Sequence, residues 1–517
     1  MKMVKSLLLG SAAGLVAVAG AQAADLPVKA KPVEYVKVCS LYGAGFWYVP
    51  GTDTCLKIGS YVRVQTEYNT GAGGIPLGAN DASPEVAGRE TRTDTSQLTY
   101  RVRAATSVDL RTQTEYGTLR SYLEVGAEVT TDASAATNAP FFDRGFIQFA
   151  GFTAGKIRSY FDINSFAPYS YSNNRVSGDT GAAGIYGMAY TAQFGNGVTA
   201  SLSLEDGGSG GNGNSVGSTG ARGHLTQNLS GVAGVAGFAL GTDTVTYDNK
   251  GWDVPDVVGA LRIDQAWGYA QIAAALHDAS GGYYTSAPGL ADACGATGTN
   301  CDTFGHPGDK YGWAITGGFT LNDVLGMKGD QFGMQAAYSQ GAAGYVTRAT
   351  GPWVMYSGNN AGVALTNDGV YVSGSGIELT TVWGINGFYQ HYWNPRWKSS
   401  LYGGYVESDF DSTAKSMYCT TGGLGVTPGV NTAAVSGVST GAATCNPNSS
   451  WWQVGTRTQW NPHPDLDIGL DVLYTRLNTA FNGATVTAAA GAQPSGATIS
   501  DQDIVSVMFR VQRNFLP

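Results

Sequence analysis

Apolar and polar residues alternate along the last segment of the chain, from Ile504 to Phe515. The alternation predicts a β-strand, because successive side chains of a strand point to opposite faces. One face would carry Val505, Val507, Phe509, Val511 and Phe515. The other face would carry Ser506, Met508, Arg510, Gln512 and Asn514. A soluble sandwich would bury the apolar face against a second layer, whereas a membrane barrel would turn it toward lipid.

The same alternation predicts sixteen strands, an even number, as closed bacterial outer-membrane barrels require. The predicted segments are 56–68, 97–111, 117–130, 141–150, 153–160, 184–194, 198–206, 254–264, 269–277, 310–321, 331–339, 378–391, 398–407, 450–460, 466–477 and 502–515.

Short and long connections alternate between these segments. The short ones are 112–116, 151–152, 195–197, 265–268, 322–330, 393–397 and 461–465. The long ones are 69–96, 131–140, 161–183, 207–253, 278–309, 340–377, 408–449 and 478–501. A barrel with periplasmic turns at one membrane face and extracellular loops at the other requires this alternation, whereas a sandwich or a propeller does not.

The polar faces of the early segments carry charges on alternate residues, which suits a water-filled lumen and opposes a soluble two-sided core. Three of these segments place arginines on the predicted inner face: Arg63, Arg101, Arg103 and Arg120. Tryptophans lie near strand ends, where interfacial aromatic girdles are expected. These are Trp252, Trp267, Trp313, Trp383, Trp393, Trp397, Trp451, Trp452 and Trp460.

Composition supports one large all-β unit. Glycine contributes 74 of 517 residues and charged residues only 13%.

Residues 1–23 are predicted to be a secretory signal peptide, with two lysines, a short apolar run and a cleavage site after Ala23. Removing Lys2 and Lys5 takes the formal net charge from −9 to −11. Such an acidic chain is a poor candidate for nucleic-acid binding.

The six cysteines fall as three pairs of near neighbours: Cys39 with Cys55, Cys294 with Cys301, and Cys419 with Cys445. Export makes disulfides the default, although six cysteines allow 15 pairings and proximity only favours these three. A zinc site at Cys294, Cys301 and His306 fits no structural zinc spacing. The five histidines are scattered and no nucleophile motif is present, so we expect neither an enzyme nor a cofactor or metal site.

The connection 161–183 carries Asp162 and Asp179 together with several aromatic residues. If it folds into the lumen, its carboxylates would face the arginine wall and create a transverse field across a constriction. Ordinary surface ion pairs are the alternative for these arginines.

Several stretches resemble the porins of rhizobia, brucellae and related alphaproteobacteria. They are Ala24–Pro27, Cys39–Gly59, Phe146–Gly155, Tyr190–Gly197 and Phe509–Phe515. The resemblance implies a trimeric, 16-stranded general diffusion porin in contact with outer-membrane lipid and lipopolysaccharide. It also implies that 161–183 is the inward-folded third loop, with Asp162 and Asp179 opposite Arg63, Arg101, Arg103 and Arg120. The chain departs from the usual aromatic end in that Leu516 and Pro517 follow Phe515.

The sequence therefore predicts a Gram-negative outer-membrane protein with a signal peptide (1–23), a periplasmic segment with a disulfide (24–55) and a transmembrane β-barrel (56–517). Its expected function is passive diffusion of small hydrophilic solutes and ions. A solute-specific channel and a surface adhesin working through loops 207–253, 340–377 and 408–449 are alternatives on the same barrel. The sign of ion selectivity stays open, because acidic loops and inner arginines act in opposite directions.

Overall fold

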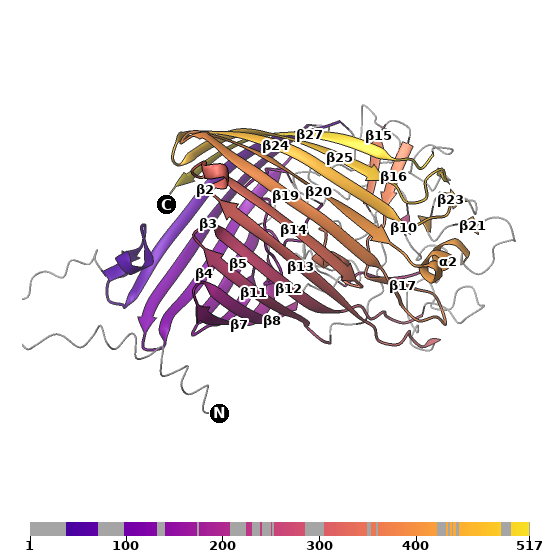
Figure 1. Ribbon diagram of the computed structural model, residues 1–517, viewed down its shortest axis with the longest axis horizontal. Helices are drawn as coiled ribbons and strands as arrows, with labels where there is room; N and C mark the ends of the chain where they lie inside the picture. Colours follow the sequence, from indigo (N-terminus) through magenta and orange to yellow (C-terminus); the bar gives the residue numbers. More distant parts are fainter. Residues whose placement is uncertain are drawn as a thin grey trace, which may run out of the picture.

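The protein forms a closed antiparallel β-barrel (Figure 1). The structure, a computed structural model, describes residues 38–70, 98–131, 140–172, 175–182, 184–206, 224–229, 238–239, 250, 253–284, 304–348, 353–357, 360–420, 431–432, 435–436, 438–440, 444–486 and 498–515. The barrel closes where the last strand pairs with the first, with Ser60 opposite Phe515. The signal peptide predicted at 1–23 lies outside the described residues.

Sixteen strands make up the barrel wall. They are β2 (Thr54–Asn69), β3 (Leu98–Thr114), β4 (Gly117–Thr130), β5 (Pro140–Phe149), β6 (Phe152–Ile157), β7 (Ile185–Gly195), β8 (Val198–Asp206), β11 (Asp256–Gln265), β12 (Gly268–Asp278), β13 (Tyr311–Asn322), β14 (Gln331–Gln340), β19 (Thr381–Asn394), β20 (Trp397–Asp409), β24 (Ser449–His463), β25 (Leu466–Asn478) and β27 (Gln502–Phe515). Each coincides with a predicted segment to within about three residues, so the predicted fold is confirmed.

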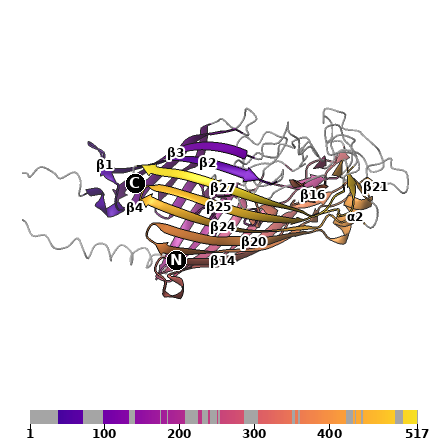
Figure 2. The ribbon, with the colours of Figure 1, turned by 90° about the horizontal axis from the view of Figure 1, so that it is seen from above.

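Short turns gather at one end of the barrel and longer connections at the other (Figures 1 and 2). A two-residue turn joins β5 to β6 through Ala150 (φ 49°) and Gly151 (φ 86°), whose left-handed conformations match the twist of the flanking strands. The chain's described end, Phe515, lies at the short-turn end with β1 (Trp47–Tyr48) and η1 (Val38–Tyr42).

Small elements cover the long-loop end, among them α2 (Ser412–Thr420), β15 (Trp353–Ser357), β16 (Asn360–Ala364) and β17 (Gly369–Tyr371). Of these, α2, β16 and β17 share an apolar core that includes Val370, Phe410, Tyr418 and Phe481, all at most 3% exposed. The small elements over this end are therefore packed around a core of their own.

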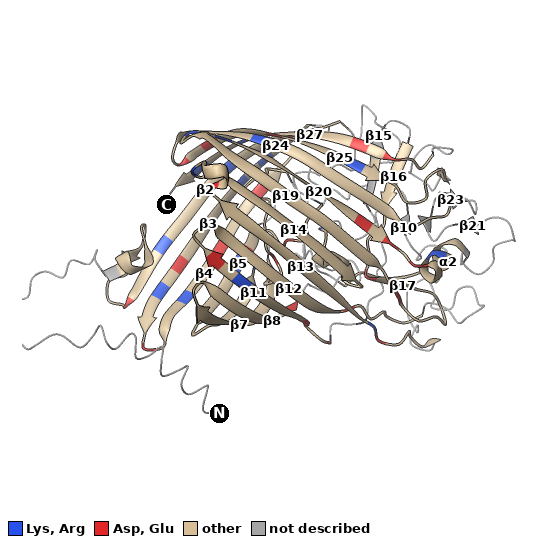
Figure 3. Ribbon diagram, in the orientation of Figure 1, with Lys and Arg blue, Asp and Glu red and all other residues tan. Residues whose placement is uncertain are grey.

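The barrel wall is apolar outside and polar inside. Along β24, Trp452, Val454 and Trp460 are exposed, whereas Gln453 and Arg457 on the alternate face are 2% exposed. The terminal strand follows the same rule, with Phe509 exposed and Arg510 buried. The ribbons of β13 and β14 carry no lysine, arginine, aspartate or glutamate, while charged positions gather on β2–β5 (Figure 3). This distribution is that of a lipid-facing exterior and a wet interior.

Exposed aromatic side chains form two bands near the strand ends. The short-turn band contains Tyr116, Phe152, Phe194, Trp267, Trp393, Trp397, Trp460 and Phe515. The long-loop band contains Tyr68, Tyr100, Tyr186, Tyr311, Trp313, Tyr338, Trp383 and Trp452. Trp451 does not belong to a girdle, because it occupies an inward position of β24 and is 0% exposed. Trp252 lies outside the described residues.

Two of the three favoured cysteine pairs form disulfides. Cys39 joins Cys55, with a Cα–Cα distance of 5.5 Å, and Cys419 joins Cys445, at 5.8 Å. Cys294 and Cys301 lie outside the described residues.

Over the part of the chain that the structure describes, no helix has the length and apolar character needed to span a bilayer.

Candidate functional site

The connection between β6 and β7 folds into the barrel and is fastened to the inner face of β12–β14. Asn164 donates from its backbone nitrogen to Gln335 Oε1 (3.1 Å). Its side-chain oxygen accepts hydrogen bonds from Tyr269 (2.9 Å) and Thr320 (2.8 Å). The inward-folded third loop expected from the sequence is thus confirmed, and its first anchor is an asparagine on the loop.

Two tyrosines fasten the middle of this loop to the wall. The Tyr169 ring stacks on Phe388 with centroids 3.5 Å apart. The backbone nitrogen of Tyr171 donates to Asp471 (2.5 Å). Gly469 makes room for the Tyr171 ring, because a Cβ at that position would lie 2.3 Å from the Tyr171 hydroxyl. The loop therefore fits against β25 only where the wall lacks a side chain.

The last part of the loop is held by β24 and by the connection that follows β14. Arg175 donates its backbone nitrogen to Gln453 (2.8 Å), and its carbonyl accepts from Trp451 Nε1 (3.0 Å). The inward orientation of Trp451 thus serves loop docking. Arg348, after the short helix η4 (Ala343–Tyr345), donates its backbone nitrogen to the Ser177 carbonyl (3.0 Å). Together these segments fill the half of the lumen bounded by β13–β25.

The opposite half of the wall carries three of the four predicted arginines in ion pairs. Arg101 pairs with Glu128, and Arg103 pairs with Glu128 (3.0 Å) and with Asp143. Arg120 binds Asp109 through two hydrogen bonds of 3.0 Å. We call these side chains the paired wall: Arg101, Arg103, Arg111, Arg120, Asp109, Glu128 and Asp143.

The fourth predicted arginine, Arg63, has a neutral partner. Its Nε donates to Gln512 Oε1 (2.7 Å) on β27, and its guanidinium lies 4.8 Å from the centroid of the Tyr61 ring. Arg63 therefore lies beside the paired wall without sharing its carboxylates.

The paired wall retains contact with solvent. The side chains of Arg111 and Arg120 are each 26% exposed, and Arg158 at the start of the loop is 40% exposed. In contrast, the inward residues of β24 and β25 are almost completely buried beneath the loop. The accessible passage through the barrel consequently runs between the loop and β2–β6.

The two predicted loop carboxylates face the loop's own backbone. Asp162 accepts from the Thr180 nitrogen (2.8 Å) and from Arg158 Nε (3.4 Å). Asp179 accepts from the Gly181 nitrogen (2.8 Å). Burial, reinforced by Asp162 and opposed by Arg348, raises the pKa of Asp179 above its ordinary value. Asp179 therefore adds less negative charge to the passage than an exposed aspartate would.

Sequence reasoning missed both the acidic partners and a second group of cations. Alternation along one strand does not pair these acids with the arginines, because the position of Glu128 opposite Arg103 becomes visible only from the register of β3 and β4. Lys398 and Arg457 were not selected, although both occupy inward positions of predicted strands.

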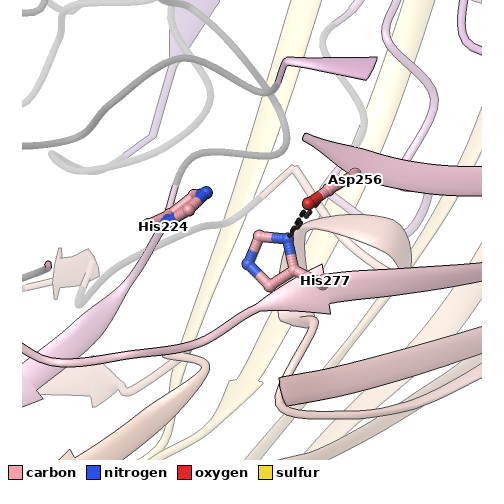
Figure 4. Close-up of side chains that lie close together, drawn as sticks. All are labelled: His224, Asp256 and His277. Carbon is pink, nitrogen blue, oxygen red and sulfur yellow. Dashed lines mark hydrogen bonds and ion pairs between the residues drawn. The ribbon is translucent and has the colours of Figure 1, made fainter. Parts of the chain in front are cut away.

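A buried histidine cluster ties the long-loop end to the wall (Figure 4). His277 lies between two carboxylates, with Nδ1 2.8 Å from Asp256 and Nε2 3.2 Å from Asp368. Asp368 also accepts from the backbone nitrogens of Leu225 and Ala343, each at 2.7 Å. The His277 side chain on β12 thereby joins the start of β11 to the connection between β14 and β19.

This cluster also contains the ligand types that bind metals. Ligating atoms of His224, Asp256 and His277 lie within 4.8 Å of one another. Each ring nitrogen of His277 lies within hydrogen-bond distance of a carboxylate, so hydrogen bonds already satisfy both nitrogens of this side chain. Burial and the neighbouring His277 lower the pKa of His224. The observed geometry is that of an ionic tether between loop and wall.

The N-terminal segment packs against inward cations at the short-turn end. Lys57 Nζ donates to the Ala44 carbonyl (3.3 Å), and the Arg111 guanidinium lies 4.8 Å from the Phe46 ring centroid. The Cys39–Cys55 disulfide holds this segment at the start of β2. The segment thus lies beside the mouth of the passage.

A closed barrel with a lipid-facing exterior, an inward-folded loop and charged inner walls is the architecture of an outer-membrane channel protein. The chain matches the porin subfamily over residues 25–508 and belongs to that family. It is an outer-membrane protein that crosses the membrane through its sixteen strands.

Two relatives and one solved structure illustrate the similarity. The chain is 32% identical to porin Omp2b of Brucella suis over 287 residues, and to porin Omp2b of Brucella abortus (strain 2308) over 274. These matches cover 51% of this chain and 64% and 63% of the relatives, slightly less than two thirds of their length. The outer membrane channel DcaP of Acinetobacter baumannii shares the fold, with a TM-score of 0.55 at 14% identity, covering 90% of this chain and 99% of that one.

Proposed function

We propose that the protein is a general diffusion porin, through which small hydrophilic solutes and ions pass passively. The observation that carries the proposal is the division of the lumen. The loop fills the side of β13–β25, while charged side chains on β3, β4 and the start of the loop stay solvent-exposed across the remaining passage. Passive diffusion needs no energy source, no cofactor and no catalytic group.

We place the constriction at the residues predicted for it: Arg63, Arg101, Arg103, Arg120, Asp162 and Asp179. Its field is weakened on both sides. Most of the arginine charge on β3 and β4 is compensated locally by Asp109, Glu128 and Asp143, and burial favours the neutral form of Asp179. Side-chain charges at this spacing give weak ion selectivity.

The proposal includes a homotrimer in outer-membrane lipid and lipopolysaccharide, with residues 24–55 on the periplasmic side after removal of 1–23. Membership of the porin family supports the trimer, and the contact of Phe46 with Arg111 near the short turns supports the periplasmic position. The mass of the purified protein in mild detergent, before and after heating, tests the trimer.

Planar-bilayer conductance tests the function. We expect large ohmic currents that appear in groups of three equal steps and do not saturate with neutral sugars. Saturation and block by one sugar would replace general diffusion with a solute-specific channel. Failure of the folded protein to insert or conduct would refute the channel function altogether.

A further inference from the structure

Four inward cations lie beside the docked loop: Arg63 on β2, Lys398 on β20, Arg457 on β24 and Arg510 on β27. These strands are neighbours in the barrel wall, with only β25 between β24 and β27. We call the four cations the cation arc. None of them lies within 4.0 Å of a carboxylate oxygen of any residue that the structure describes. Their hydrogen-bond and ring contacts are instead neutral. Arg457 donates to Gln390 Oε1 (3.1 Å), Arg510 donates to the Tyr171 carbonyl (3.2 Å), and Lys398 lies over the Tyr392 ring.

Two members of the arc are deeply buried. Arg457 is 2% exposed and Arg510 is 8% exposed, and their guanidinium carbons lie 5.0 Å and 4.0 Å from the centroid of the Tyr171 ring. The Nε of Arg457 is inaccessible to solvent and has no hydrogen-bond partner in the described structure. A buried charge is costly unless a counter-charge or hydrogen bonds compensate it. The arc is therefore short of negative charge.

Loop docking explains the shortage. Asp471 lies directly opposite Arg457 in the pairing of β24 with β25. Its carboxylate accepts instead from the Tyr171 nitrogen and from the Tyr402 hydroxyl, so the loop and its support occupy the nearest acid. A second carboxylate, Asp467, is attracted to all four cations and forms a close pair with none of them. The cations outnumber the acids that face them.

The arc is accessible from the short-turn mouth. Lys398 and Asp467 are the second residues of β20 and β25, next to the short turns, and both are half-buried. Arg63 is also half-buried and is the member of the arc nearest to the paired wall along the barrel, since β2 pairs with β3. Arg63 and Lys398 thus offer accessible donors, while Arg457 and Arg510 supply positive charge from beneath the loop.

We propose that the cation arc is a binding subsite for small multivalent oxyanions of the phosphate class. Guanidinium and ammonium donors are the groups that recognise such anions, and the uncompensated charge of Arg457 and Arg510 would favour a multivalent anion over chloride. The inference rests on the proposed channel function for its biological meaning. The binding itself can be measured without conduction.

The test adds inorganic phosphate to single channels held in constant potassium chloride. We expect saturable reduction of the chloride current, because phosphate occupies the subsite. Arg457→Gln and Lys398→Gln should each weaken the apparent phosphate affinity about tenfold, because Lys398→Gln removes a charge-assisted donor and Arg457→Gln removes positive charge beneath the loop. Matched controls are Arg476→Gln, whose residue pairs with Asp501, and Lys250→Gln, whose residue pairs with Asp309. Both controls should keep wild-type phosphate affinity.

A second variant changes affinity in the opposite direction. Asp467→Asn removes the acid within the arc and should tighten phosphate binding severalfold, because the cations lose their internal competitor. This result cannot come from damaged folding, which would only weaken binding. If Arg457→Gln fails to fold, Lys398→Gln and Asp467→Asn still decide the question.

Calorimetry with phosphate on the detergent-solubilised protein separates the two proposals. Binding without conduction would refute the channel and retain the subsite. Ohmic conduction without saturable phosphate binding would refute the subsite and retain the channel. Equal phosphate affinity in the wild type, Arg457→Gln and Lys398→Gln would also overturn the subsite.

Discussion

The paired wall and the cation arc are neighbouring parts of the same lumen. They differ in the groups that contact their cations, which are carboxylates in the paired wall and neutral groups in the arc. In the paired wall, each arginine has a carboxylate within ion-pair distance. In the arc, Arg63, Arg457 and Arg510 contact amides, a carbonyl and aromatic rings. Cation content alone therefore does not describe the electrostatics of this barrel.

Register and loop docking account for the difference. Glu128 lies directly opposite Arg103 on the neighbouring strand, so the paired wall needs no further element. Arg63 faces Gln512, and Arg510 faces Gln65, so neither arginine lies opposite an acid in the pairing of β2 with β27. Arg457 does face Asp471, but the loop takes that carboxylate for the Tyr171 nitrogen. A folded-in loop thus changes the charge of a wall it covers.

The largest effect is expected at His277, the most completely paired inward cation. His277→Ala would leave Asp256 and Asp368 buried without their shared partner, and breaking such a pair costs about 3 kcal/mol. We expect faster hydrogen exchange and proteolysis within 360–371. The control, His463→Ala, changes an exposed histidine at a short turn and should cost less than about 0.5 kcal/mol. Unchanged protection in His277→Ala would refute the tether.

Acid should release the same tether. Burial alone would raise the pKa of Asp368. His277 and two backbone donors nevertheless hold this pKa below its ordinary value. A depressed pKa means that the stabilisation is complete above the unfolded value, about 3.9, and is lost as the pH falls through the folded value. Protection of 360–371 should therefore persist from neutral pH to about pH 4 and fall below it. Asp368→Asn should abolish this loss of protection at acid pH. If the variant keeps the loss, a group other than Asp368 titrates.

Removing cations from the paired wall should change selectivity more than removing one from the arc. Arg101→Ala combined with Arg103→Ala deletes two charges and also frees Glu128 and Asp143. The potassium-to-chloride permeability ratio should rise severalfold, because the paired wall changes from an excess of one positive charge to an excess of one negative charge. Arg63→Ala frees no carboxylate and should give a smaller shift. Reversal potentials in a salt gradient measure both, and equal shifts would contradict the local pairing.

The smallest effect separates two tyrosines on either side of the docking site. The Tyr171 hydroxyl has no hydrogen-bond partner in the described structure, so Tyr171→Phe should change unfolding free energy by less than about 0.5 kcal/mol. Tyr402→Phe removes the donor to Asp471 and should cost about 1–2 kcal/mol. Urea unfolding in lipid vesicles measures both. A larger cost for Tyr171→Phe would show that its hydroxyl is satisfied in solution.

Prediction from sequence succeeded where one strand sufficed. The alternation of Val505, Val507 and Phe509 with Ser506 and Arg510 assigned the two faces of β27, and the structure confirms them. It failed at Trp451, whose neighbour Trp452 does belong to a girdle. Tryptophan near a strand end suggests an interface, but the strict period of two decides the face, and at Trp451 it points inward to the loop.

The candidate site was predictable in part for the same reason. Arg101, Arg103 and Arg120 could be placed on inner faces, but their partners depend on register between strands. Arg457 and Asp471 show the limit most clearly, because even a correct register would pair them. The competing acceptor role of Asp471 arises from a loop residue 300 positions earlier in the chain.

The sequence by itself determined the barrel, its lipid-facing and lumen faces, and the alternation of turns and loops, since these follow from local period and segment length. The tertiary structure alone decided which lumen charges are neutralised, where the loop leaves a passage, and how His277 joins wall and loop. Ion pairing and burial depend on distances between residues far apart in the chain. Only the closed barrel with its docked loop sets those distances.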